Sequence, residues 1–332
     1  MRLLVTGGAG FIGSNFVHYW LERHPDDRLV AYDLLTYAGN RENLLGTDDR
    51  VPFVQGDIGD QDLVERTIRE HGVDTIVNFA AESHNSLAVV DPGLFARTNV
   101  LGTQLLLEAA RATGVTRFHH ISTCEVYGDL ALDSDDAFTE ETPYRPRTPY
   151  NASKAAADHY VRAYHETFHV PVTITNCSNN FGPYQFPEKV IPLFVTNALD
   201  GGPLPMYAST QNRREWLHVH DHCRAIEQVL EAGRVGETYN VGSGVEKSIE
   251  EIADLVLELT GKSADLKQIV PDRPGHDRRY LLDSTKLRSE LGWEPEIAFD
   301  DGLRETVDWY AEHRDWWQPL KERLQVEETA WR

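Results

Sequence analysis

The chain has 332 residues, and its 53 acidic against 32 basic side chains give a formal net charge of −21. Hydrophobic residues make up 41 % of the sequence, which is enough to form a folded core and excludes an intrinsically disordered chain. The acidic excess disfavours partners with phosphate backbones or anionic surfaces, so we expect neither a nucleic-acid nor a membrane partner. The length suggests roughly two domains of about 150 residues.

The three cysteines, Cys124, Cys177 and Cys223, are widely spaced and form no CxxC pair. A disulfide framework or a zinc site is therefore not expected, and no other metal site is predicted. The sequence also lacks an apolar run of about 18 residues, which a membrane-spanning helix would need. These features favour a cytoplasmic protein.

Short apolar runs alternate with helical patterns through the first half of the chain. Strands are expected near residues 3–5, 29–31, 51–54, 75–79, 117–121 and 172–176, and helices near 11–21, 60–71, 95–112 and 150–168. This spacing predicts successive βαβ units. The expected fold is therefore α/β, with a Rossmann-type, doubly wound parallel sheet.

The strand–helix alternation breaks after residue 178, where Gly and Pro residues mark loops. We predict that residues 1–178 form a cofactor-binding Rossmann domain and that residues 214–244 return to it. Residues 179–332 are expected to form a smaller, mixed α/β domain that binds the substrate.

A glycine-rich segment, TGGAGFIG at residues 6–13, follows the first expected strand and opens the first expected helix. Its glycines permit a tight turn and the close approach of a pyrophosphate, which the N–H groups of the helix N-terminus bind. Asp33 lies 20 residues after Gly13, at the end of the second expected strand. A carboxylate there binds the adenosine ribose of NAD and repels the 2′-phosphate of NADP, so the sequence predicts NAD.

Tyr150 and Lys154 form a YxxxK pair at the start of an alanine-rich helical segment. Because residues i and i+4 share a helix face, we predict that the ammonium group lowers the pKa of the phenol and lets it exchange a proton with a sugar hydroxyl. Upstream, Thr123, Cys124 and Glu125 end the fifth expected strand with a hydroxyl, a thiol and a carboxylate. Together these side chains predict a centre for acid–base chemistry.

On these motifs the sequence resembles the extended short-chain dehydrogenase/reductases, and specifically the dTDP-glucose 4,6-dehydratases. The likeness covers nearly the whole chain. It includes the glycine-rich segment, FAAESH at 79–84, SNNFGP at 178–183, FPEK at 186–189 and DRPGHDRRY at 272–280.

The resemblance implies a lyase that dehydrates a nucleotide-linked hexose, with dTDP-glucose giving dTDP-4-keto-6-deoxyglucose and NAD carrying hydride. Tyr150 would take the proton of the 4-hydroxyl while hydride leaves C4, and Thr123 would hold the same oxygen. Glu125 would then remove the C5 proton, water would leave from C6, and hydride would return to C6.

The resemblance also implies a homodimer, with the helices near residues 95–112 and 150–168 in its interface. The residues expected to bind NAD are Gly7, Gly10, Phe11, Ile12, Gly13, Asp33, Asp57, Ile58, Ala80, Thr98, Tyr150 and Lys154. The expected catalytic residues are Thr123, Cys124, Glu125, Tyr150 and Lys154. The residues expected to bind the nucleotide-diphosphate sugar are Ser83, His84, Asn180, Lys189, Tyr207, Arg214, Arg273 and His276, with Arg214 on the diphosphate and Tyr207 against the base.

Two departures from the family's pattern bear on the chemistry and on the sugar. Cys124 stands where these dehydratases usually carry the aspartate that protonates the departing C6 hydroxyl, and the GDP-mannose 4,6-dehydratases carry serine there. A thiol is mostly protonated at neutral pH and could donate instead, the alternative being a buried structural cysteine. Residues 85–88, NSLA, replace a Val-Asp-Arg-Ser type stretch beside the sugar, so the accepted hexose can differ.

Other functions stay open at this point. A UDP-glucuronate decarboxylase keeps a glutamate at position 125, whereas a 4-epimerase needs no base at C5. A non-catalytic, NAD-binding sensor is the third alternative, and the presence of Thr123, Glu125, Tyr150 and Lys154 disfavours it.

Overall fold

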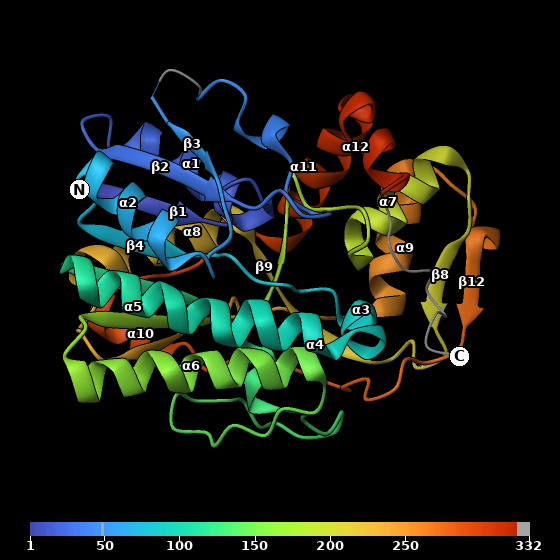
Figure 1. Cartoon of the computed structure of the whole chain (residues 1–332). Helices are drawn as coiled ribbons and strands as arrows, with labels where there is room; N and C mark the ends of the chain where they lie inside the picture. Colours follow the sequence, from blue (N-terminus) through green and yellow to red (C-terminus); the bar gives the residue numbers. More distant parts are fainter. Residues whose placement is uncertain (48–49, 324–332) are drawn as a thin grey trace.

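The computed structural model describes residues 1–47 and 50–323. Its centre is a seven-stranded parallel sheet in the order β10-β6-β5-β4-β1-β2-β3, covered by helices on both faces (Figure 1). These strands are β1 (Arg2–Thr6), β2 (Arg28–Asp33), β3 (Phe53–Gln55), β4 (Thr75–Asn78), β5 (Arg117–Thr123), β6 (Val172–Cys177) and β10 (Thr238–Val241). This arrangement confirms the predicted Rossmann-type, doubly wound sheet.

The apolar core lies on both faces of the sheet, because helices cover parallel strands from each side. Along β1, Leu3 and Val5 pack with α1 (Phe11–Arg23) and α8 (Val219–Ala232), while Leu4 belongs to a second cluster on the opposite face. The helices that contribute to that second cluster are α2 (Gln61–His71), α5 (Thr103–Thr113) and α6 (Pro149–Phe168).

Local capping sets where α6 begins. The Thr148 side chain accepts a hydrogen bond from the backbone N–H of Asn151 at 3.2 Å. Pro149 occupies the first helical position, where the N–H that it lacks would have no intrahelical partner. Tyr150 therefore lies in the first turn of α6, which packs against β5.

The remaining elements form a smaller, mixed α/β part, seen on the right of Figure 1. In it β7 (Asn179–Phe181), β9 (Arg213–His218) and β11 (Glu246–Ser248) form one sheet, and β8 (Leu204–Tyr207) pairs with β12 (Lys267–Val270). The helices around its own apolar core are α7 (Val190–Asp200), α9 (Ile249–Thr260), α11 (Phe299–Glu312) and α12 (Arg314–Lys321).

The segment predicted to return to the main sheet, residues 214–244, divides between the two parts. Strand β10 and helix α8 lie with the main sheet, whereas β9 pairs with β7 and β11. Conversely, α10 (Thr285–Leu291) packs against β10 although it follows residue 178. The domain boundary at 178 thus stays a prediction, and residues 324–332 of the predicted second domain lie outside the described residues.

Short helical elements complete the described chain. They are η1 (Arg41–Leu44), α3 (Asn85–Val90), α4 (Pro92–Phe95), the π-helical η2 (Ala96–Gly102), η3 (Cys124–Tyr127) and η4 (Ala264–Leu266). None of the helices in residues 1–47 and 50–323 is long and apolar enough to cross a membrane.

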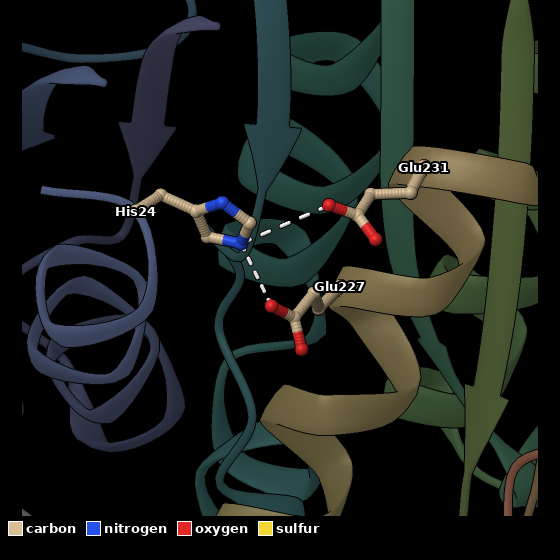
Figure 2. A group of neighbouring side chains, drawn as sticks. All are labelled: His24, Glu227 and Glu231. Carbon is tan, nitrogen blue, oxygen red and sulfur yellow. Dashed lines mark hydrogen bonds and ion pairs between the residues drawn. The ribbon is translucent and has the colours of Figure 1, made fainter. Parts of the chain in front are cut away.

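A buried carboxylate joins α1 to α8. Glu227 accepts hydrogen bonds from the Tyr19 hydroxyl and, at 2.7 Å, from His24 Nε2, and Arg23 Nε lies 3.4 Å away. Figure 2 shows His24 between Glu227 and Glu231, with ligand atoms of the three residues within 4.8 Å of one another. Because protein donors already engage Glu227 and the Arg23 guanidinium adds positive charge beside it, we interpret the group as a structural link.

Glu227→Gln should lower the free energy of unfolding by about 1–3 kcal/mol at neutral pH, because charge-assisted hydrogen bonds are lost from a buried group. Burial alone would raise the pKa of Glu227, but the hydrogen bonds from Tyr19 and His24 and the charge of Arg23 outweigh it, so the pKa is lowered. A lowered pKa stabilises the fold at neutral pH, and this contribution is lost as the pH falls through it.

The free energy of unfolding can be measured in urea at two pH values, one neutral and one below the ordinary glutamate pKa of about 4.3. The difference between wild type and Glu227→Gln should narrow at the lower pH, and an equal difference at both would contradict the assignment. Glu231→Gln is the control, since the Glu231 side chain is 50 % exposed and should contribute little.

Candidate functional site

A cavity of about 500 Å³ lies at the carboxyl ends of the parallel strands, where the strand order reverses around β1. Its lining brings together all but one of the residues singled out in the sequence. From the main sheet and its helices these are Gly7, Gly10, Phe11, Ile12, Gly13, Asp33, Asp57, Ile58, Ala80, Ser83, His84, Thr98, Thr123, Glu125, Tyr150 and Lys154. From the smaller part they are Asn180, Lys189, Tyr207, Arg214, Arg273 and His276.

The glycine-rich turn has the shape that a dinucleotide needs. Gly7 has φ +67°, and a Cβ on it would lie 2.7 Å from the backbone nitrogen of Ala80. A Cβ on Gly13 would lie 2.2 Å from the carbonyl oxygen of Gly7. The turn then opens α1 without a side-chain cap, so the first N–H groups of that helix are available to a pyrophosphate at the cavity. These residues fit NAD.

Asp33 ends β2 with its carboxylate fixed against the glycine-rich turn. It accepts hydrogen bonds from the backbone N–H groups of Ala9 at 3.0 Å and Leu35 at 2.8 Å. Burial raises the pKa of Asp33, and these two hydrogen bonds oppose that rise. The held carboxylate still lines the cavity, as binding of an adenosine ribose requires.

The π-helical turn η2 connects the loop after β4 to the helix that carries Tyr150. Asn99 accepts from the Glu82 N–H at 2.8 Å and donates to the Glu82 carbonyl at 2.9 Å. The same amide donates to Ser153 Oγ at 2.8 Å, and Ser153 in turn donates to the Tyr150 carbonyl at 2.7 Å. The turn places Thr98 in the cavity wall and fixes the first turn of α6 against it.

Tyr150 lines the cavity, but its predicted interaction with Lys154 is not the one found. Lys154 Nζ donates to the carbonyl of Ile121 at 2.7 Å and lies 3.3 Å from His120 Nε2. Burial, and next the charge of Glu125, raise the pKa of Tyr150 well above its ordinary value. The lysine thus extends toward the end of β5, and its predicted effect on the pKa of Tyr150 stays a prediction.

Glu125 and Thr123 meet beside Tyr150. The Thr123 hydroxyl accepts from the Glu125 backbone N–H at 3.3 Å and forms a hydrogen bond with Tyr150. The Glu125 carboxylate accepts from the side-chain amide of Asn85 at 3.2 Å, and Thr148 donates to that amide's oxygen at 3.2 Å. A phenol, a hydroxyl and a carboxylate thus share one wall of the cavity.

Cys124 is the one predicted catalytic residue that does not line the cavity. It is 1 % exposed and packs with Val126, Tyr127, Phe138 and Tyr280 in an apolar cluster. Burial raises the pKa of Cys124 well above its ordinary value. This position disagrees with the predicted acid role and agrees with the structural alternative.

A second group of polar side chains closes the cavity from the smaller part. Glu188 accepts from the Tyr37 hydroxyl at 2.8 Å and lies 3.1 Å from His84 Nδ1 and 3.4 Å from Lys189 Nζ. Lys189 also donates to the carbonyl of Ser83 at 2.7 Å. Burial, and next the charge of Lys189, lower the pKa of His84 to about 3, so the imidazole is neutral at physiological pH.

Two arginines supply positive charge where a diphosphate is expected. The terminal nitrogens of Arg214 donate to backbone carbonyls, including that of Asp277 at 2.8 Å, which fixes the guanidinium plane. Arg273 Nε is buried without a protein partner. His276, which contacts the Tyr207 ring edge-on at 5.0 Å, is neutral because burial and the two arginines lower its pKa to about 3.

Unpaired buried polar atoms mark the same cavity as a ligand site. In the described part of the chain, Ser178 Oγ, Asn179 Oδ1 and Gln185 Oε1 also lack a protein partner, and all three residues line it. Such atoms cost free energy unless a ligand or water satisfies them. Asn180 differs, because its amide donates to the Ser178 carbonyl at 2.9 Å and accepts from His222.

Sequence reasoning missed several lining residues, namely Glu82, Asn85, Glu188 and Tyr280. Glu188 and Tyr280 stand in the family-like stretches at 186–189 and 272–280, so a signal for them was present. No local pattern distinguishes Asn85, which stands in the stretch that departs from the family.

A glycine-rich turn, an aspartate at the end of β2 and a Tyr150–Lys154 pair beside one cavity define a short-chain dehydrogenase/reductase. The added substrate-facing part places the protein in the extended class.

Comparisons with known proteins give the particular family. A family model described as GDP-mannose 4,6 dehydratase matches residues 4–306. A dTDP-glucose 4,6-dehydratase of Streptomyces niveus is 51 % identical to the chain, over 97 % of the chain and 96 % of the relative. One of Mycobacterium tuberculosis is 50 % identical, over 98 % of each. The chain belongs to the dTDP-glucose 4,6-dehydratase family.

Solved structures agree. The Streptomyces venezuelae dTDP-glucose 4,6-dehydratase, determined with NAD bound, has a TM-score of 0.93 and 51 % identity, over 96 % of this chain and 100 % of that chain. A Thermus thermophilus UDP-glucose 4-epimerase in complex with NAD has a TM-score of 0.87 and 34 % identity, over 94 % and 100 %. The fold is therefore shared with epimerases, so the reaction has to be inferred from the residues of the site.

Proposed function

We propose that this protein is an NAD-dependent hydro-lyase that converts dTDP-glucose to dTDP-4-keto-6-deoxyglucose. The observation that carries the proposal is the meeting of Glu125 with Tyr150 and Thr123 at one wall of the cavity. A 4-epimerase needs the phenol but no carboxylate base beside C5. The neutral His84 and the guanidinium groups of Arg214 and Arg273 suit an uncharged sugar joined to a diphosphate.

The residues that would hold NAD line the cavity: the glycine-rich turn and the N-terminus of α1 would bind its pyrophosphate, and Asp33 would bind its adenosine ribose. Asp57, Ile58, Ala80 and Thr98 would make further contacts, and Lys154 would bind the cofactor beside Tyr150. The chemistry that bound NAD supplies is reversible hydride transfer and a positive charge at the nicotinamide ring, which favours the Tyr150 phenolate.

The chain's own residues move the protons. Tyr150 accepts the proton of the 4-hydroxyl, and Thr123 holds the same oxygen through its hydroxyl. The 4-ketone acidifies C5–H, and the Glu125 carboxylate, fixed by the Asn85 amide, removes that proton. On the substrate side, Tyr207 and His276 flank the base, and Ser83, Asn180 and Lys189 bind the sugar diphosphate.

The mass of the product tests this function. The purified protein with NAD should convert dTDP-glucose to a product lighter by one water. An unchanged mass with an altered sugar configuration would indicate an epimerase, and loss of carbon dioxide from UDP-glucuronate would indicate a decarboxylase. Either result without dehydration would overturn the proposal.

We further propose a cytoplasmic homodimer. The three cysteines are buried free thiols, as a reducing compartment allows. Helices α5 and α6 run side by side on one flank of the molecule (Figure 1). Tyr160 and Phe168 of α6 are 43 % and 47 % exposed, and Leu101, in the π-helical η2 that leads into α5, is 53 % exposed. Large exposed apolar side chains on adjacent helices favour an interface between two copies. Sedimentation of Leu101→Asp beside wild type tests it, since only the variant should sediment as a monomer.

A further inference from the structure

Tyr280 and Asp277 form a buried pair at the cavity wall that the steps above do not use. Tyr280 lines the cavity, and its hydroxyl donates to the Asp277 carboxyl group, which is 1 % exposed. The Asn151 amide donates to the same carboxyl oxygen at 3.3 Å, and Arg147 lies 3.4 Å from the other. The Arg214 guanidinium lies over the Tyr280 ring at 4.7 Å. Asn151 and Arg147 thus fix the Asp277 carboxyl group, and Arg214 packs on the Tyr280 ring.

The dehydration step lacks a proton donor among the residues assigned so far. Hydroxide is a poor leaving group, so the C6 oxygen has to be protonated as its bond to carbon breaks. Cys124 lies outside the cavity, Glu125 accepts the C5 proton, and Tyr150 serves the C4 oxygen. Tyr280 carries an O–H in the cavity wall, close enough to Glu125 for the carboxylate's charge to act on it.

Resting on the proposed function, we propose that Tyr280 protonates the departing C6 hydroxyl and that Asp277, acting through Tyr280, replaces the proton. The C5–H bond breaks, its proton passes to Glu125, and its electron pair forms the C5–C6 double bond. The C6–O bond breaks, and the oxygen takes the Tyr280 proton and leaves as water. The Tyr280 oxygen then takes the Asp277 proton, and Arg147 and Asn151 stabilise the carboxylate that remains.

The surroundings of Asp277 suit a proton source. Burial raises its pKa to about 6, and the negative charge of Glu125 adds to the rise, while the hydrogen bond from Tyr280 and the charges of Arg214 and Arg147 oppose it. The carboxyl group is therefore partly protonated near neutral pH. Since Asp277 can return a proton to Tyr280 only while it is itself protonated, the rate of turnover should fall as the pH rises above about 6.

A change of leaving group tests the proposal. Tyr280→Phe and Asp277→Asn are assayed with dTDP-glucose and with its 6-deoxy-6-fluoro analogue, because fluoride departs without being protonated. Both variants should convert dTDP-glucose about 10²-fold or more slowly than wild type and convert the fluoro analogue within a few-fold of it. Glu125→Gln should be slow with both substrates, since each needs the C5 proton removed.

Tyr127→Phe is the matched control. Tyr127 belongs to the same apolar cluster as Tyr280, and its hydroxyl donates to Asn240 at 2.8 Å, but it does not line the cavity. Its loss should reduce stability without changing either rate. NAD binding and thermal unfolding of each variant establish that it is folded.

Each result bears on one claim. Wild-type rates of both variants on dTDP-glucose, or equal losses on both substrates, would overturn the Tyr280–Asp277 donor and leave the proposed function standing. A wild-type protein inactive on both substrates would overturn the proposed function itself. Should a variant fail to fold, the wild-type pH profile decides: the decline above about pH 6 must appear with dTDP-glucose and not with the fluoro analogue.

Discussion

Glu125→Gln should abolish dehydration, lowering its rate by about 10²–10⁴-fold, because an amide cannot remove the C5 proton. Glutamine keeps the size of the side chain, and the Thr123 contact to the backbone N–H at 125 does not depend on the carboxylate. NAD binding should therefore be unchanged. Two measurements check the result. Mass spectrometry should detect no product that is lighter by one water, and the C5 hydrogen should no longer exchange with deuterated solvent.

Glu140→Gln is the control for this substitution. Glu140 is also partly buried and accepts a backbone N–H from Asn240 at 2.8 Å, but it does not line the cavity. It should retain wild-type turnover. Wild-type exchange at C5 in Glu125→Gln would show that another group is the base.

The cofactor half of the site could be predicted because its signals are local. The turn at residues 6–13 requires glycine for reasons visible in a short stretch, and parallel strands bring Asp33 to the same edge of the sheet. A regular βαβ pattern fixes which ends of the strands meet. Asp33 and the glycines therefore come together once the sheet is predicted.

The sequence alone left two roles open for Cys124, because the chain changes conformation at this residue. Thr123 ends β5 in an extended conformation, with φ −143° and ψ 150°. Cys124 then begins the 3-10 helix η3, so the alternation of side chains along the strand stops at Thr123 and does not fix where residues 124 and 125 point. Two of the three side chains reach the cavity, and the thiol packs into the apolar cluster behind them.

The contacts of Asn85 and Lys154 could not be predicted, because residues distant in sequence decide them. Asn85 meets Glu125 across 40 positions, at the start of the short helix α3. Lys154 shares a helix face with Tyr150, yet its ammonium donates to the carbonyl of Ile121 on the neighbouring strand at 2.7 Å. Helical spacing predicts which residues are neighbours on a helix, but it does not predict which partner a long side chain binds.

The net charge of −21 says little about this site, whose ligands are anions. His276 is neutral and Lys189 is partly neutralised by Glu188, so most of the positive charge for a diphosphate comes from Arg214 and Arg273. Two guanidinium groups in a cavity outweigh a diffuse surface excess, because solvent and salt screen the distant charges.

Tyr150→Phe should abolish turnover by about 10²–10⁴-fold while leaving NAD bound, because phenylalanine keeps the ring and loses the oxygen that accepts the 4-hydroxyl proton. It should also stop exchange of the C5 hydrogen, even with Glu125 intact, since C5–H becomes acidic only beside the 4-ketone. Tyr164→Phe is the control on the same helix, since Tyr164 does not line the cavity and loses only a hydroxyl that donates to Glu108, so turnover should be unchanged. If the C5 hydrogen still exchanged in Tyr150→Phe, Glu125 would act without prior oxidation at C4, which would contradict the proposed order of steps.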